Sequence, residues 1–91
     1  MSDITDQILF SGQVQGVGFR WTTSRIASGL PVTGYVRNLP DGRVEAVVAG
    51  TAASIQRLID QLRERFGSGI TDIERHPEEF ANAFTGFSIR Q

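Results

Sequence analysis

Hydrophobic residues recur along this chain with two periods, one typical of β-strands and the other typical of helices. Helical spacing of three and four residues predicts a first helix over about 19–28, which Gly29 and Pro31 end, and a second helix from an N-cap at Thr51 to Phe66. Apolar residues that alternate, or run together between polar boundaries, predict strands at 7–14, 33–38, 43–49, 70–76 and 86–90.

The order of these elements predicts an α+β fold of the ferredoxin-like βαββαβ type. Residues 39–42 read Leu-Pro-Asp-Gly, which is a strong signal for a hairpin between the second and third strands. Both helices carry one apolar stripe, so the economical packing places them on one face of an antiparallel sheet. No linker or low-complexity tract interrupts the pattern, and we expect a single domain over residues 1–91.

Composition and charge narrow the range of partners. The net charge is −1, and no apolar run approaches the roughly 18 residues of a membrane span, so we expect neither a nucleic-acid nor a membrane partner. The chain has no cysteine, and its one histidine, His76, lacks companions for a metal site, so neither a metal nor a cofactor is expected. A polar N-terminus without a signal pattern adds the expectation of a cytoplasmic monomer.

The chemistry-bearing segment is residues 12–20, Gly-Gln-Val-Gln-Gly-Val-Gly-Phe-Arg, called here the glycine loop. It lies where the first strand gives way to the first helix. Glycines there allow backbone N–H groups to turn around an anion, and the helix N-terminus adds further N–H groups. Arg20 supplies a guanidinium group suited to phosphate oxygens. The loop therefore predicts a phosphate site, although the same glycines would also serve a tight turn that binds nothing.

Two familiar phosphate-binding loops are excluded by the residues themselves. A P-loop requires a lysine, and this chain has none, while a dinucleotide fingerprint requires glycine where Trp21 stands. Trp21 would either shield the mouth of the loop or pack on the helix surface. Asn38 ends the second predicted strand, and from local sequence alone it is best interpreted as a turn residue that bonds its own backbone.

Two motifs in register resemble those of the acylphosphatase family. The glycine loop is similar to the family signature GxVQGVxFR, and residues 34–45 are similar to its second motif, G[WY]VxNxxDGxVE. The resemblance extends from about Gln7 to Arg90. It departs at Gln13, where relatives often carry a basic residue, and at Pro31, which replaces a helix-ending glycine, so that Gly29 is expected to take over the cap.

The resemblance implies a function and a role for each matching residue. Members hydrolyse small-molecule acyl phosphates to a carboxylate and inorganic phosphate without a cofactor. By resemblance, Arg20 binds the substrate phosphate, and Asn38 orients the attacking water in line with the leaving oxygen. The same resemblance assigns phosphate binding to the backbone amides of six consecutive residues, Gln15, Gly16, Val17, Gly18, Phe19 and Arg20.

A second reading of the same residues belongs to another functional class. It is a non-catalytic ferredoxin-like module whose loop contacts the phosphate groups of nucleic acid or of a partner. The net charge of −1 disfavours this alternative.

Overall fold

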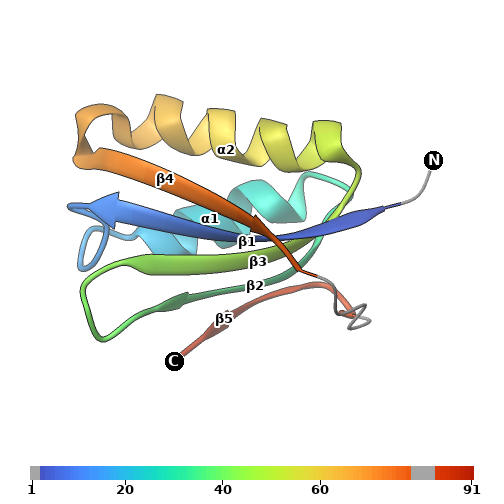
Figure 1. Ribbon diagram of the computed structural model, residues 1–91, viewed down its shortest axis with the longest axis horizontal. Helices are drawn as coiled ribbons and strands as arrows, with labels where there is room; N and C mark the ends of the chain where they lie inside the picture. The colour runs from blue at the N-terminus through green and yellow to red at the C-terminus, as the bar shows by residue number, and fades with distance from the viewer. Residues whose placement is uncertain (1–2, 79–83) are drawn as a thin grey trace.

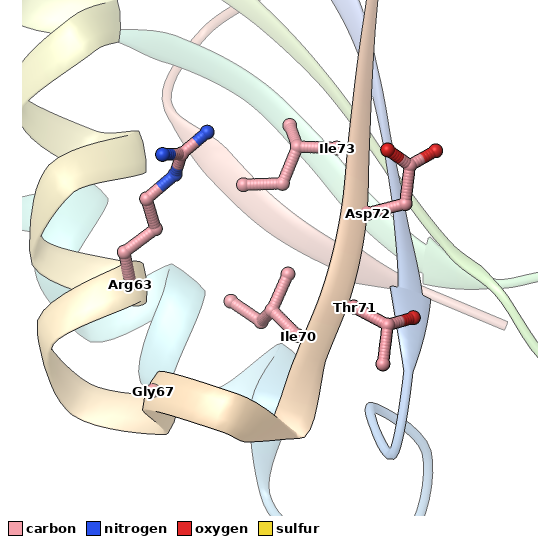
Figure 2. Close-up of a pocket in the computed structure, with 6 residues that line it drawn as sticks. All are labelled: Arg63, Gly67, Ile70, Thr71, Asp72 and Ile73. Atoms are coloured by element: carbon pink, nitrogen blue, oxygen red, sulfur yellow. The ribbon is translucent and has the colours of Figure 1, made fainter.

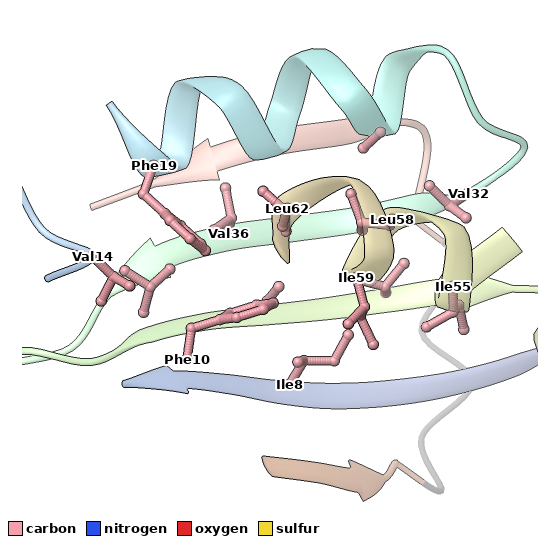
Figure 3. Close-up of a cluster of buried hydrophobic side chains, with 14 residues drawn as sticks. Ile8, Phe10, Val14, Phe19, Val32, Val36, Ile55, Leu58, Ile59 and Leu62 are labelled. Carbon is pink, nitrogen blue, oxygen red and sulfur yellow. The ribbon is translucent and has the colours of Figure 1, made fainter. Parts of the chain in front are cut away.

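The computed structural model describes residues 3–78 and 84–91. Its two helices lie on one face of a five-stranded sheet (Figures 1 and 3). The predicted order of elements is confirmed, with boundaries that move by one to three residues. The elements are β1 (Ile4–Gly12), α1 (Phe19–Ser28), β2 (Thr33–Asn38), β3 (Val44–Gly50), α2 (Ala52–Phe66), a 3₁₀ turn η1 (Gly67–Gly69), β4 (Ile70–Pro77) and β5 (Phe87–Arg90).

The sheet has the strand order β4-β1-β3-β2-β5, and one of its pairings differs from the expected antiparallel sheet. β1, β2, β3 and β4 pair antiparallel, whereas β5 pairs parallel to β2. The reason is topological. β4 and β5 lie at opposite edges of the sheet (Figure 1). Few residues separate them in the sequence, so β5 begins at the end of the sheet where β4 finishes. It therefore runs opposite to β4, which is the direction of β2. The ferredoxin-like α+β class is confirmed, with a mixed rather than a purely antiparallel sheet.

The core fills the space between the helices and the sheet. The predicted apolar stripe of α2 is buried through Ile55, Leu58, Ile59 and Leu62, which face the strands in Figure 3. Phe19, at the start of α1, packs its ring 5.0 Å from that of Phe10 and 4.7 Å from that of Phe66. This aromatic stack anchors the beginning of α1, and with it the end of the glycine loop, in the core.

The predicted turn and cap residues are found where the sequence placed them. The Thr51 hydroxyl accepts a hydrogen bond from the Ser54 N–H at 3.1 Å and caps α2. Gly42 has φ +95° in the hairpin, as a tight β2–β3 turn requires. Gly29 is the C-cap of α1, but its φ is −95°, so α1 ends here without the left-handed residue that commonly closes a helix.

The face of the sheet opposite the helices carries a buried carboxylate. Glu45 on β3 is 5% exposed and accepts hydrogen bonds from Gln7 at 2.7 Å and from Arg37 at 2.6 Å. Burial disfavours its charged form, but the hydrogen bonds from Arg37 and Gln7 outweigh burial and hold the pKa of Glu45 below its usual value. Glu45 thus ties β1, β2 and β3 together across this face.

Because its pKa is lowered in the folded state, Glu45 contributes stability at neutral pH, and that contribution is lost as the pH falls from the ordinary glutamate pKa through the lower pKa of the folded state. We expect Glu45→Gln to lower the free energy of unfolding by about 1–3 kcal/mol at neutral pH. The variant should also lose less stability than the parent between neutral pH and about pH 3. Urea unfolding across this range measures both effects. The exposed Glu64→Gln on α2 is the control, and equal pH slopes for Glu45→Gln and the parent would contradict the assignment.

Candidate active site

The glycine loop connects the end of β1 to the first turn of α1 in a conformation that only glycine adopts readily. Gly16 and Gly18 have φ values of +76° and +77°, in the left-handed region. A Cβ atom at either position would meet nothing within 4 Å. Glycine is therefore required by the backbone conformation rather than by crowding, and the space around these two positions is open to a ligand.

The N-terminus of α1 opens beside this space. Gly18 is the N-cap and supplies no side-chain hydrogen bond, and the first turn of α1 contains no acidic residue. The first helical hydrogen bond runs from the Thr22 N–H to the Gly18 carbonyl at 2.9 Å. The N–H groups of Phe19, Arg20 and Trp21 precede it and have no partner within the helix, so the helix start offers donors and a positive dipole end to an anion.

Arg20 stands in the first turn of α1, where a positive charge opposes the helix dipole. Its side chain is half-buried, and it forms no ion pair with any acid in residues 3–78 or 84–91. Arg43, in the neighbouring hairpin, differs in that it pairs with Asp41 at 2.8 Å and with Glu74 at 3.5 Å. The guanidinium group of Arg20 is therefore available to a ligand, whereas that of Arg43 is engaged in the fold.

Asn38 ends β2 opposite Val44 of β3. Its side-chain oxygen Oδ1 is buried and has no hydrogen-bond partner among the described residues. The interpretation from local sequence, a side chain bonded to its own turn, is therefore wrong for Oδ1. In the hairpin it is Asp41 that fills this role, because its carboxylate accepts the Arg43 N–H at 3.0 Å. A buried oxygen without a donor is costly, and it marks a place where a donor from a ligand or water fits.

One pocket of about 180 Å³ brings these groups together. Its lining includes Arg20 and Asn38, which are distant in sequence, together with the predicted loop residues Gly16, Gly18 and Phe19. Val14, Trp21 and Ile89 complete the lining. Gln15 and Val17, which were predicted to offer backbone amides, are not part of it.

The side chain of Gln15 has a structural role that the sequence analysis did not predict. Its side-chain Nε2 donates to the Leu39 carbonyl at 2.8 Å and to the Arg43 carbonyl at 2.9 Å. The glycine loop is thereby fastened to both ends of the β2–β3 hairpin turn, directly beside Asn38. No signal in the sequence singles out Gln15, because Gln13 carries the same side chain in the same loop and is exposed.

Two further residues of α1 receive an assignment. The buried Thr23 hydroxyl donates to the Phe19 carbonyl at 2.8 Å, so it bonds its own helix rather than the loop. Trp21 is 60% exposed at the pocket, and Arg25 lies 5.2 Å from the centroid of its ring. Of the two alternatives for Trp21, the position at the mouth of the loop is the one that the geometry favours.

A second, larger pocket of about 380 Å³ lies between the end of α2 and β4. Its lining does not combine an arginine with a glycine-rich loop and an unpartnered side-chain oxygen, as the pocket of Arg20 and Asn38 does. Figure 2 shows Arg63 above the apolar side chains of Ile70 and Ile73, while Asp72 points to the other side of the strand. No acid therefore faces Arg63 within the lining.

The part of the chain that the structure describes contains no group of three or more His, Asp or Glu side chains able to hold a metal ion. None of its helices is long and apolar enough to cross a membrane.

Fold and site together define a ferredoxin-like domain with a glycine-rich loop beside Arg20 and Asn38, and comparisons with known proteins identify its family. The acylphosphatase family model matches residues 6–89. The acylphosphatase of Caldivirga maquilingensis is 43% identical over 91 residues, which cover 98% of this chain and 96% of the relative. The chain belongs to the acylphosphatase family, and the expected enzyme class is confirmed in preference to a non-catalytic module.

Solved structures agree with this assignment. The crystal structure of acylphosphatase from Bacillus subtilis has a TM-score of 0.87 and 30% identity, and the match covers 97% of this chain and 99% of that one. HypF of T. kodakarensis matches with a TM-score of 0.82 and 32% identity over 94% of this chain, but over only 12% of its own. The same fold thus occurs both as a stand-alone chain and as part of a much larger protein.

The two hydrogen bonds of Gln15 lead to a stability prediction. We expect Gln15→Met, which keeps the length of the side chain and removes both donors, to lower the free energy of unfolding by about 1–3 kcal/mol. Gln13→Met is the matched control, because Gln13 lies exposed in the same loop. Urea denaturation midpoints compare the two variants. Equal stability of both would mean that Gln15 does not fasten the loop to the hairpin.

Proposed function

We propose that this protein hydrolyses acyl phosphates to a carboxylate and inorganic phosphate, with Arg20 and Asn38 as its catalytic residues. One observation carries the proposal: Asn38, whose Oδ1 has no partner among the described residues, lines the same pocket as the glycine loop and Arg20, which pairs with none of the described acids. Membership of the acylphosphatase family supports the reaction class.

The phosphate group is bound by the guanidinium group of Arg20 and by backbone N–H groups of residues 15–20, of which Gly16, Gly18, Phe19 and Arg20 line the pocket. These donors share the negative charge of the non-bridging phosphate oxygens, which is the main electrostatic requirement of phosphoryl transfer. The bound anion also reverses the unfavourable interaction between Arg20 and the dipole of α1, since a negative charge then lies beside both positive ends. A residue that breaks a local rule of helix design is expected where a ligand compensates for it.

Asn38 acts on water rather than on phosphate. Its buried Oδ1 is a hydrogen-bond acceptor, and an ionised phosphate oxygen has no proton to donate to it. A water molecule does have one. Oδ1 accepts a hydrogen bond from an O–H group of that water. The water is thereby held with a lone pair directed at phosphorus, in line with the bridging oxygen of the leaving group.

The proposed reaction needs no general acid. Water attacks phosphorus, the bond between phosphorus and the bridging oxygen breaks, and the electron pair stays with the leaving carboxylate. Because the conjugate acid of a carboxylate has a pKa near 4, the leaving group departs without being protonated. The proton of the attacking water passes to a phosphate oxygen of the product. The protein therefore contributes position and charge stabilisation, which Arg20, the loop amides and Asn38 supply.

Two substitutions separate these roles. We expect Asn38→Ala to lower kcat for benzoyl phosphate by about 10²–10³-fold, with less than a threefold change in the inhibition constant of inorganic phosphate. Arg20→Ala should lower kcat/KM by at least about 10³-fold and also weaken phosphate binding, because it removes the one charged group of the pocket lining. Steady-state release of phosphate measures these constants.

Arg57→Ala is the control, because it removes one arginine from the exposed side of α2. It should leave kcat and KM unchanged. Equal losses of phosphate affinity in Asn38→Ala and Arg20→Ala would contradict the separate roles. A folded parent protein with no activity above that of Arg20→Ala would overturn the proposed reaction.

A further inference from the structure

Exposed apolar side chains gather at the mouth of the active-site pocket. Four large hydrophobic residues are substantially exposed in the described chain, and two of them line this pocket: Trp21 at 60% on α1 and Ile89 at 44% on β5. Val17, at 50%, belongs to the glycine loop and is not part of the lining. The fourth, Ile4, begins β1 opposite Gly50, at the far end of the strand from the loop.

The in-line geometry of the proposed displacement places the acyl group of the substrate beside these side chains. The water held by Asn38 is on the inner side of the pocket, because the Oδ1 atom that receives it is buried. In-line displacement requires the leaving group to be on the opposite side of phosphorus. The acyl group therefore points outward from the phosphate, toward the opening where Trp21 and Ile89 are exposed.

The same opening offers little to a charged acyl group. Arg20 is the only charged residue of the pocket lining, and the phosphate engages it. Arg25, the nearest arginine on α1, is stacked 5.2 Å from the centroid of the Trp21 ring. The surfaces left for the acyl group are one aromatic ring and aliphatic side chains, which stabilise apolar and aromatic groups by burial and stacking.

We propose that Trp21 and Ile89 form an acyl-group subsite that selects uncharged, apolar or aromatic acyl phosphates over small or anionic ones. The inference rests on the proposed hydrolysis and deepens it by naming the substrate class. The phosphate would be recognised by the loop and Arg20 in every substrate. Preference among substrates would be set by the apolar mouth.

A binding experiment tests the subsite without relying on turnover. Benzylphosphonate and methylphosphonate share the anionic group and differ in the apolar part, and neither can be hydrolysed as an acyl phosphate. We expect benzylphosphonate to bind about three- to tenfold more tightly, consistent with a stacking contact. Trp21 is the only tryptophan of the chain, so its fluorescence reports the contact directly. Benzylphosphonate should shift the emission to the blue and inorganic phosphate should not.

Matched variants then locate the subsite. We expect Ile89→Ala and Trp21→Ala each to lower the ratio of kcat/KM for benzoyl phosphate to kcat/KM for acetyl phosphate by about three- to tenfold. Trp21→Phe should restore most of the ratio. Ile4→Ala, a similar truncation at 41% exposure but at the other end of β1, should leave the ratio unchanged.

The outcomes distinguish this inference from the proposed function. If benzoyl and acetyl phosphate are hydrolysed but the ratio is the same in Ile89→Ala, Trp21→Ala and Ile4→Ala, the subsite is wrong and the reaction stands. A preference for succinyl phosphate over benzoyl phosphate would likewise overturn the subsite. If neither substrate is turned over, the proposed reaction fails, and equal affinities for the two phosphonates would then reject the subsite as well.

Discussion

The site depends on one side-chain amide that joins two distant parts of the chain. Gln15 donates to the carbonyl groups of Leu39 and Arg43, and these two residues flank the β2–β3 turn. The pairing of β2 with β3 fixes the turn, the core fixes the start of α1, and the two hydrogen bonds of Gln15 join the loop to the hairpin. The amide of Gln15 thus spans the gap between the elements that carry Arg20 and Asn38, the two residues proposed to bind phosphate and water in one pocket.

Arg20 differs from the three arginines that pair with acids in the described part of the chain. Arg37 is bound to Glu45, Arg43 to Asp41, and Arg75 to Asp6, each at 2.8 Å or less. These pairs fasten strands to each other or close the hairpin. Arg20 has no such acid among the described residues, and it stands at the end of a helix that repels it. Within residues 3–78 and 84–91 the charge of Arg20 is therefore left without an acid partner, which is what the proposed phosphate-binding role requires.

The hydrophobic pattern was sufficient for the elements, the core stripe of α2 and the hairpin, because each depends on local spacing or on turn residues such as Gly42. The parallel edge strand β5 was not predictable in this way, since its direction depends on which edge the chain reaches after β4. Local sequence also misjudged Asn38, because a turn asparagine and one with an unpartnered buried oxygen look the same until β3 lies beside it. Only the register of two motifs pointed to its place in the site.

The packing beneath the loop explains how so few groups can suffice for this chemistry. Phe19 is 1% exposed and stacks with both Phe10 and Phe66, so the residue next to Arg20 is held by β1 and α2 at once. A reaction that needs no general acid depends on holding phosphate and water at fixed positions. Rigidity is supplied by the core through Phe19 and by the hairpin through Gln15. Trp21 and Ile89, on the exposed side of the pocket, belong to neither anchor, so a substitution at either position leaves both anchors in place.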